Sequence, residues 1–254
     1  MHWKFWQKKP SQNFEFWSVF EPLNDPQLDY LRPQPASKFF PEWIKSIPKE
    51  LKYPKDVVPD SPFKLLAPTV KQCPVFAETL IQGYIIPLWQ DYKIMINEDH
   101  SYHWQANYRD KCMIVDVHPD QQYINWLPDN ERKRLATTLK FNCPWRIRTP
   151  KGWSCYQMPL YYHFMPWNVL FGSIRTDTHS EINIQVAFPR DIIGKEILIP
   201  RGTPFAWYIP YKRESLGLQK IDYDHNMTAA NEYGFYSKFR DGYKTHAKIK
   251  DKKD

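Results

Sequence analysis

The residues from 181 to 188 alternate between two kinds of side chain. Apolar residues stand at Ile182, Ile184, Val186 and Phe188, and the residues between them are Glu181, Asn183, Gln185 and Ala187. A period of two is typical of a β-strand that buries one face. Short apolar segments, separated by Pro and Gly turns, surround this strand from Cys143 to Glu214. This spacing predicts a β-sandwich or jelly roll.

The balance of proline and glycine points the same way. The 254 residues include 23 Pro and 8 Gly, and 17% are aromatic. Proline donates no hydrogen bond to a helix or a sheet ladder, so this content predicts short elements, fixed turns and few long helices. Aromatic side chains favour strands and contact surfaces. We therefore expect a mainly β fold with a few short helices.

Further elements follow from local patterns. Strands are expected at 14–20, 84–88, 92–96, 102–108, 113–117, 139–141, 145–149, 154–158, 170–174, 196–199 and 205–211. Short helices are expected at 40–45, 74–82 and 128–134, with Asp129 as a cap, and a C-terminal helix at 228–239. The strands at 92–96 and 102–108 flank a turn and predict a hairpin.

The chain divides into three segments of one globular domain. A Pro-rich and aromatic segment at 1–72 is expected to pack on the core, 73–214 to form the β-sandwich, and 215–254 to carry a helix and a disordered basic tail. From Glu232 to Asp254 there are seven Lys or Arg and four Asp or Glu. This tail is interpreted as solvated, with a nucleic-acid-binding arm as the alternative.

The four cysteines and the hydropathy pattern indicate the compartment. No Cys-x-x-Cys motif is present, and no apolar run is long enough for a signal peptide or a membrane span. We expect reduced thiols, no membrane contact and a cytoplasmic location.

Several short motifs in the central stretch resemble the dUTPase-like jelly roll. They are Thr149-Pro150-Lys151-Gly152-Trp153, Gly172-Ser173-Ile174-Arg175-Thr176-Asp177, Glu181-Ile182-Asn183-Ile184 and Ile199-Pro200-Arg201-Gly202-Thr203-Pro204-Phe205. The resemblance implies a β-clip with a degenerate site at Arg175 and Asp177, and a homotrimer with clefts between its subunits. Arg175 replaces the family's aspartate base, and a guanidinium cannot accept a proton near neutral pH. The family's Arg-Ser-Gly motif has no counterpart at 159–163, so nucleotide hydrolysis is not expected.

Taken as a whole, the chain resembles a family of uncharacterised proteins encoded by phages, especially marine ones, and by some bacteria. The residues that carry this resemblance are Phe40-Pro41-Glu42-Trp43-Ile44-Lys45, Val70-Lys71-Gln72-Cys73-Pro74, Gly83-Tyr84-Ile85-Ile86-Pro87-Leu88-Trp89, Pro150-Lys151-Gly152-Trp153, Gly202-Thr203-Pro204 and Ile209-Pro210-Tyr211-Lys212-Arg213-Glu214. The resemblance implies a phage protein in the host cytoplasm or in the virion, and it brings no activity.

One constellation could hold a metal. His118 and Asp120 have the His-x-Asp spacing of a non-haem iron site. His179 could complete the ligand set, and Arg190 could anchor a dicarboxylate substrate. Pro119 between the two ligands favours an exposed turn. We therefore expect no metal and no cofactor, with iron at His118, Asp120 and His179 as the alternative.

Aromatic residues offer a second kind of site. A band of aromatic residues, half of which must lie in the core by alternation, consists of Trp145, Trp153, Tyr156, Tyr161, Tyr162, Trp167, Trp207, Tyr208 and Tyr211. We expect a contact surface that includes Trp153, Trp167, Trp207, Tyr208, Tyr211 and Arg213. The first hypothesis is a non-enzymatic β-rich protein that contacts other protein subunits, including copies of itself, as a phage structural or particle-associated protein. The alternatives are a jelly-roll enzyme, either an iron oxygenase or a diverged dUTPase-like nucleotide enzyme, and a module that binds glycans or nucleic acid.

Overall fold

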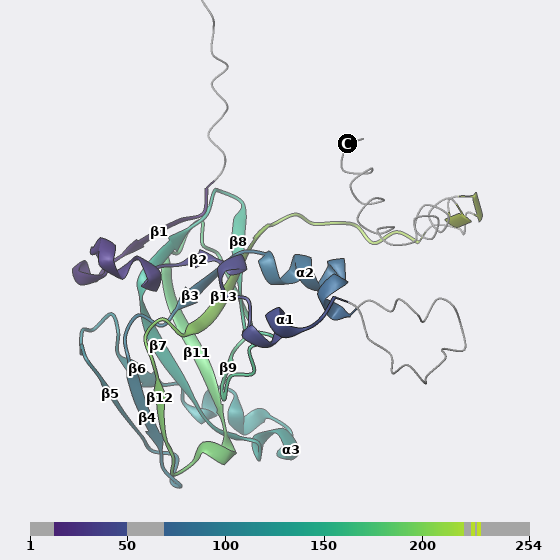
Figure 1. Ribbon diagram of the computed structural model, residues 1–254. Coiled ribbons are helices and arrows are strands. Elements are labelled where there is room, and N and C mark those ends of the chain that lie inside the picture. Colours follow the sequence, from purple (N-terminus) through teal and green to yellow (C-terminus); the bar gives the residue numbers. More distant parts are fainter. Residues whose placement is uncertain (1–12, 50–68, 221–224, 227, 230–254) are drawn as a thin grey trace, which may run out of the picture. The chain divides into compact units, whose positions relative to one another are not determined.

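A computed structural model describes residues 13–49, 69–220, 225–226 and 228–229 (Figure 1). The chain forms two compact units. The first contains Met1–Glu42 and Ile81–Arg213, and the second contains Trp43–Leu80 and Glu214–Asp254. All strands of the described residues lie in the first unit. No helix in the described ranges is long and apolar enough to cross a membrane.

The strands form three antiparallel sheets (Figure 1). The β7 sheet has the order β1 (Glu15–Ser18), β7 (Leu135–Arg148), β11 (Glu181–Pro189) and β9 (Asn168–Val169), and β6 (Val115–Val117) also pairs with β7. The β13 sheet has the order β10 (Gly172–Ile174), β8 (Trp153–Met158), β13 (Pro204–Lys212), β3 (Tyr84–Pro87) and β2 (Gln34–Pro35). The β4 sheet has the order β12 (Glu196–Ile199), β4 (Tyr92–Ile96) and β5 (Tyr102–Ala106).

The core joins the sheets. The four apolar residues that alternate along β11 are all buried, and Ile184 lies opposite Phe141 of β7. The same apolar cluster contains Ile86 and Tyr208 from the β13 sheet and Ile94 from the β4 sheet. The apolar residues alternate along β11 because one face of this strand packs against a second sheet, as the sequence predicted. The predicted mainly β fold, a sandwich with a few short helices, is confirmed.

One strand is longer than predicted. The sequence indicated separate strands at 139–141 and 145–149, but β7 continues through Pro144. On one edge of β7, β6 pairs with residues 139–141 and β1 with residues 145–148, so Pro144 lies between the two partners. On the other edge the register with β11 shifts between Asn142 and Arg146. The missing proline N–H therefore removes no regular ladder bond.

The short helices lie close to the predicted positions. They are α1 (Glu42–Ser46), α2 (Pro74–Ile81) and α3 (Asp129–Arg132). Asp129 was expected to cap α3, but the cap position is Pro128, and Asp129 is the first helical residue. The predicted helix at 228–239 lies almost entirely outside the described residues, which include 228–229 in helical conformation. The predicted basic tail lies outside them as well.

The N-terminal aromatic residues pack on the sandwich, as predicted. The ring of Phe14 stacks on Tyr84 with 4.2 Å between centroids, and Phe16 meets the ring of Trp145 edge-on. Phe20 contacts Tyr108 in a tilted arrangement. These contacts are of the kind expected for the predicted clamp, whose first aromatic residues, Trp3, Phe5 and Trp6, lie outside the described residues.

Candidate functional site

The β13 sheet is apolar on both faces. The register places Trp207 opposite Met158, Ile209 opposite Tyr156 and Tyr211 opposite Ser154, so these residues share one face. The alternate residues, which include Cys155 and Tyr208, belong to the sandwich core. A sheet that faced water on its outer side would carry polar residues there. Part of this outer face is covered by the chain itself, because Ala36 and Leu160 pack in one cluster with Trp207, and the part around Tyr156 and Tyr211 is half-buried.

Three aromatic rings are stacked across this outer face. Tyr156 of β8 lies between Tyr211 of β13, at a centroid distance of 4.1 Å, and Phe171, at 5.4 Å. The Tyr211 hydroxyl is hydrogen-bonded to the Ser173 hydroxyl at 2.6 Å. Stacking and this hydrogen bond fix the rings before any partner arrives, which lowers the entropy lost on binding. Phe171 remains 63% exposed at the end of the stack.

A pocket of about 290 Å³ adjoins this face. It is lined by Pro159, Leu160, Tyr161, Tyr162, Phe164, Met165, Trp167, Asn168, Val169 and Phe205. Phe205 and Trp167 are buried, and their rings lie 6.2 Å apart. Leu160 and Met165 also pack in the apolar cluster that contains Trp207. The pocket is thus continuous with the outer face of the β13 sheet.

The rim of the pocket is strained. Tyr162 and Phe164 have positive φ angles of 70° and 51°, a region that bulky residues rarely adopt. Each such residue costs about 1–3 kcal/mol, and such strain concentrates at functional sites. The two rings are nevertheless 40% and 79% exposed. Burial lowers the pKa of His163, which lies between them, so that its imidazole is neutral near pH 7.

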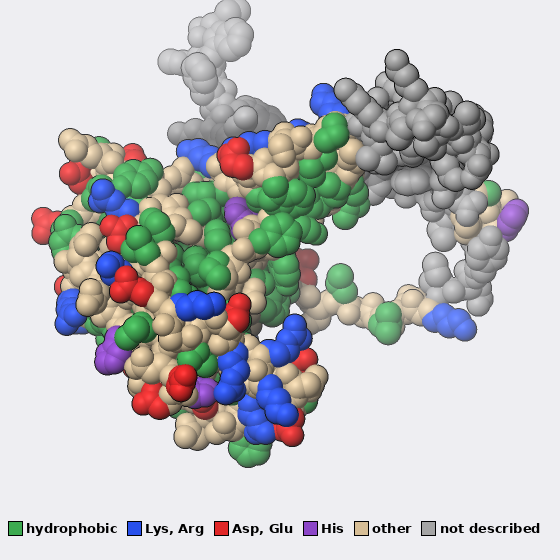
Figure 2. Space-filling view, turned by 60° about the horizontal axis from the view of Figure 1, so that its bottom comes forward, with side chains coloured by type: hydrophobic (Ala, Val, Ile, Leu, Met, Phe, Trp, Pro, Cys, Tyr) green, Lys and Arg blue, Asp and Glu red, His purple; other side chains and the backbone are tan. Residues whose placement is uncertain are grey.

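These side chains form one continuous surface, which we call the aromatic surface. It consists of Tyr156, Met158, Phe171, Ile209 and Tyr211 on the sheet and Tyr161, Tyr162 and Phe164 on the pocket rim. None of these residues carries a charge near neutral pH. Aromatic residues and Met are enriched in the centres of protein interfaces, where charged residues are depleted. Figure 2 shows hydrophobic side chains among those exposed on one face.

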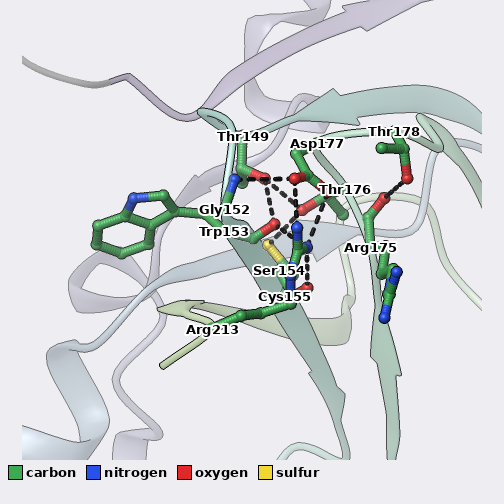
Figure 3. A network of polar contacts seen from close by, with 10 residues as sticks. All are labelled: Thr149, Gly152, Trp153, Ser154, Cys155, Arg175, Thr176, Asp177, Thr178 and Arg213. Carbon is green, nitrogen blue, oxygen red and sulfur yellow. Dashed lines mark hydrogen bonds and ion pairs between the residues drawn. The ribbon is translucent and has the colours of Figure 1, made fainter. Parts of the chain in front are cut away.

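A polar network ties the strands beneath this surface together (Figure 3). The guanidinium of Arg213 donates to both carboxylate oxygens of Asp177, at 2.8 and 2.5 Å. The Gly152 N–H donates to Asp177 Oδ2 at 2.9 Å, and Arg213 also donates to the Ser154 hydroxyl at 2.8 Å. The network therefore joins the turn before β8, the segment after β10 and the end of β13.

The Arg213 guanidinium, and after it the Gly152 N–H, hold the pKa of Asp177 well below its usual range. The Asp177 side chain is 4% exposed, and that of Arg213 is 29% exposed. A carboxylate whose two oxygens both accept hydrogen bonds, and whose pKa is lowered, is a poor general base near neutral pH. Asp177 thus acts as a structural ion.

Arg175, the other residue of the predicted degenerate site, does not join this network. Its backbone carbonyl accepts from the Thr178 hydroxyl at 3.2 Å, and Figure 3 shows its side chain apart from Asp177. The sequence motif at 172–177 therefore contains one residue that braces the fold and one exposed cation.

The predicted iron ligands are not brought together. The His118 N–H bonds to Thr138 O, and Ser180, next to His179, accepts from the N–H of Ile147. These two points on β7 are nine residues apart, which is roughly 30 Å along an extended strand. In the part of the chain that the structure describes, no three His, Cys, Asp or Glu residues could hold a metal ion. His118, Asp120 and His179 therefore do not form one ligand set in the described structure.

The six predicted contact residues have different positions. Trp207 and Tyr208 are buried; their polar groups donate to Gln82 O and Gln157 Oε1 at 2.7 and 2.8 Å. These two rings therefore lie in the core half of the aromatic band. Trp167 is also buried, but it lines the pocket. The other three lie nearer the surface: Tyr211 belongs to the ring stack, Arg213 pairs with Asp177, and the half-buried indole of Trp153 points away from the ion pair (Figure 3).

Sequence reasoning missed four members of the site: Met158, Phe164, Phe171 and Ile209. Two of them carried a signal, because along both β8 and β13 each alternate set of residues contains large apolar side chains. A strand that is apolar in both phases is buried or contacted on both faces. The signal for Phe164 and Phe171 was absent, since their positions depend on a loop conformation.

The comparisons with known proteins give the following. No family model matches the sequence, and no curated protein matches it. Among solved structures, the chain is similar to a mutant dUTPase from phage phi11 of S. aureus, with a TM-score of 0.30 and 9% identity over 57% of this chain and 85% of that chain. It is also similar to the dUTPase of Staphylococcus bacteriophage 80alpha with dUPNHPP, with a TM-score of 0.31 and 9% identity over 57% of this chain and 78% of that chain.

The fold class rests on the three antiparallel sheets of the chain itself.

Proposed function

We propose that this chain is a non-enzymatic β-rich protein that works by contact with other protein subunits, and that its first partner is a second copy of itself. The aromatic surface is the observation that carries the proposal. Its rings are prearranged by stacking, and a pocket of about 290 Å³ adjoins them. Its centre is uncharged, so it makes no demand for an oppositely charged partner.

An apolar surface of this kind suits association between identical chains. In a two-fold contact the same patch lies on both sides, and charged groups at its centre would face like charges. The chain carries a net charge of +7. A surface without Lys or Arg at its centre allows two such chains to approach despite that charge, because salt screens the charges around it.

The role we propose for this association is that of a phage structural or particle-associated protein in the host cytoplasm and the virion. The ionised, fully hydrogen-bonded carboxylate of Asp177 supports a structural role for the motif at 172–177. This is the motif that suggested a nucleotide enzyme.

The first experiment is sedimentation velocity over a wide range of protein concentrations. The wild-type chain is expected to form a defined oligomer, and the double variant Phe164→Ser/Phe171→Ser to be monomeric. Both rings are exposed, at 79% and 63%, so their loss should lower the thermal midpoint only slightly, through the lost stacking of Phe171 on Tyr156. Leu198→Ser is the matched control, because Leu198 is 55% exposed on β12 and belongs to another sheet.

Two outcomes would contradict the self-association: a wild-type chain that is monomeric throughout, or a Leu198→Ser variant that dissociates as readily as the double variant. The role in the particle is tested separately, by mass spectrometry of purified phage particles. If the chain is an oligomer in solution but missing from the particles, the particle-associated role is wrong, and the contact surface stands.

A further inference from the structure

Trp126 is held as an open aromatic platform. It is 82% exposed, more than any other tryptophan among the described residues. Its indole N–H donates to Gln121 O at 2.8 Å, and it ends a short 3-10 helix, Ile124–Trp126. The hydrogen bond fixes the ring, while its faces remain in water. The exposed faces of this ring bury no apolar surface in the fold. They are therefore open to stack on a flat ligand.

Four exposed cations lie on the chain segment that follows Trp126 and on a second segment bonded to it. Three of them are consecutive at the end of α3: Arg132, Lys133 and Arg134. The fourth is Arg190, whose N–H donates to Arg134 O at 2.9 Å and so brings the segment after β11 beside the end of α3. All four residues are exposed. We call this group the basic patch. Figure 2 shows Lys and Arg side chains, with a few carboxylates among them, gathered toward the lower right.

Within the described ranges, two of these four cations form no ion pair with a neighbouring carboxylate. Arg132 pairs with Asp129, and Arg134 pairs with Glu131 at 3.5 Å, both at exposed positions. Lys133 and Arg190 have no carboxylate within ion-pair distance among the described residues. Exposed ion pairs of this kind contribute about 0–1 kcal/mol, so a phosphate group can replace the carboxylates at little cost.

From these observations we infer that Trp126 and the basic patch bind single-stranded nucleic acid. A base stacks on the indole of Trp126, and the backbone phosphates contact Lys133 and Arg190, with Arg132 and Arg134 as additional donors. The ligand is single-stranded because a base within a duplex is already stacked and cannot lie on the indole. The site includes no residue of the aromatic surface, so it is independent of the function proposed above.

The test is fluorescence anisotropy with a short labelled oligothymidine strand and the full chain, at several salt concentrations. Trp126→Ala is expected to weaken binding roughly 10- to 100-fold, since the stacking of one base contributes about 1–3 kcal/mol. Trp126→Phe should restore part of the loss. In Lys133→Glu/Arg190→Glu, the slope of log K against log salt should fall by about 1.4, for two lost phosphate contacts.

A matched control separates the site from the general positive charge. Lys151→Glu/Arg175→Glu makes the same change in net charge at two exposed positions outside the patch, and should bind the strand nearly as well as the wild type. The inference is overturned if the wild type does not bind the strand, if Trp126→Ala binds normally, or if the control double variant loses as much affinity as the patch variant. Tighter binding of a duplex than of the single strand would overturn it as well.

Discussion

Gly83 holds β3 against β13, and its replacement tests how closely these strands pack. Its φ is +66°, and a Cβ atom at this position would overlap the carbonyl oxygen of Tyr208 and lie 3.0 Å from Ile209 Cα. Both are backbone atoms of β13, so no side chain can move aside. The Gly83 carbonyl also accepts from the N–H of Ala36 at 3.0 Å. Gly83→Ala should therefore displace two strands of the β13 sheet.

The magnitude follows from two contributions. The left-handed backbone costs a residue with a Cβ about 1–2 kcal/mol, and forcing an extra carbon into a packed site costs about 1–3 kcal/mol more. Gly194→Ala is the matched control, because Gly194 has a φ of +75° and a Cβ atom there would meet nothing within 4 Å. The entropy that alanine removes from the unfolded chain is the same in both variants and cancels in the comparison.

The assay is thermal unfolding followed by circular dichroism. For a chain of this size, 1 kcal/mol corresponds to about 2–4 °C, so Gly83→Ala should melt roughly 2–12 °C below Gly194→Ala. If the two variants melt at the same temperature, or if Gly194→Ala is the less stable, the close approach of Gly83 to β13 does not limit the packing and the argument fails.

Three further predictions concern the interior and the polar network. Tyr92→Phe should cost about 1–3 kcal/mol in the free energy of unfolding, measured with denaturant, because its buried hydroxyl donates to Met113 O at 2.7 Å and accepts two further hydrogen bonds. Burial raises the pKa of the Cys155 thiol to about 11, so at pH 8 iodoacetamide should modify the exposed Cys73 and leave Cys155 unmodified until the chain unfolds; equal rates would contradict this. Asp177→Asn should reduce the fall in thermal midpoint between about pH 5 and pH 2. The pKa of Asp177 is lowered in the folded chain, so its carboxylate stabilises the fold above the pKa of the unfolded chain, and this stabilisation is lost when the carboxylate is protonated. The same fall in thermal midpoint in the variant and the wild type would refute the role of the ion pair.

Much of the fold was predictable because it depends on short-range patterns. The alternation along β11 predicts its strand and its buried face, and the turn between β4 and β5 predicts their hairpin. Pro144 shows where this reasoning fails. Its effect on β7 depends on which partner strand lies opposite, and the pairing of β6 and β1 is set by distant segments.

The sequence predicted the aromatic character of the candidate site, but it did not predict which residues form it. The abundance of Tyr and Trp indicated a contact surface, but Trp207 and Tyr208 are buried, while Phe164 and Phe171 are exposed. Which aromatic rings reach solvent depends on what covers each face of the β13 sheet. A local pattern contains no information about that cover.

Local patterns in the sequence predicted most of the elements: the alternating strands, their apolar faces, and most of the ends at proline and glycine, with Pro144 inside β7 as the exception. The tertiary structure alone decided what those elements make together. It pairs Asp177 with Arg213, 36 residues away in the chain, and it continues the outer face of the β13 sheet into the pocket beneath Tyr162 and Phe164. The physical reason is that backbone conformation responds to neighbouring residues, whereas ion pairs, pockets and exposure depend on which distant segments the sheet registers bring together.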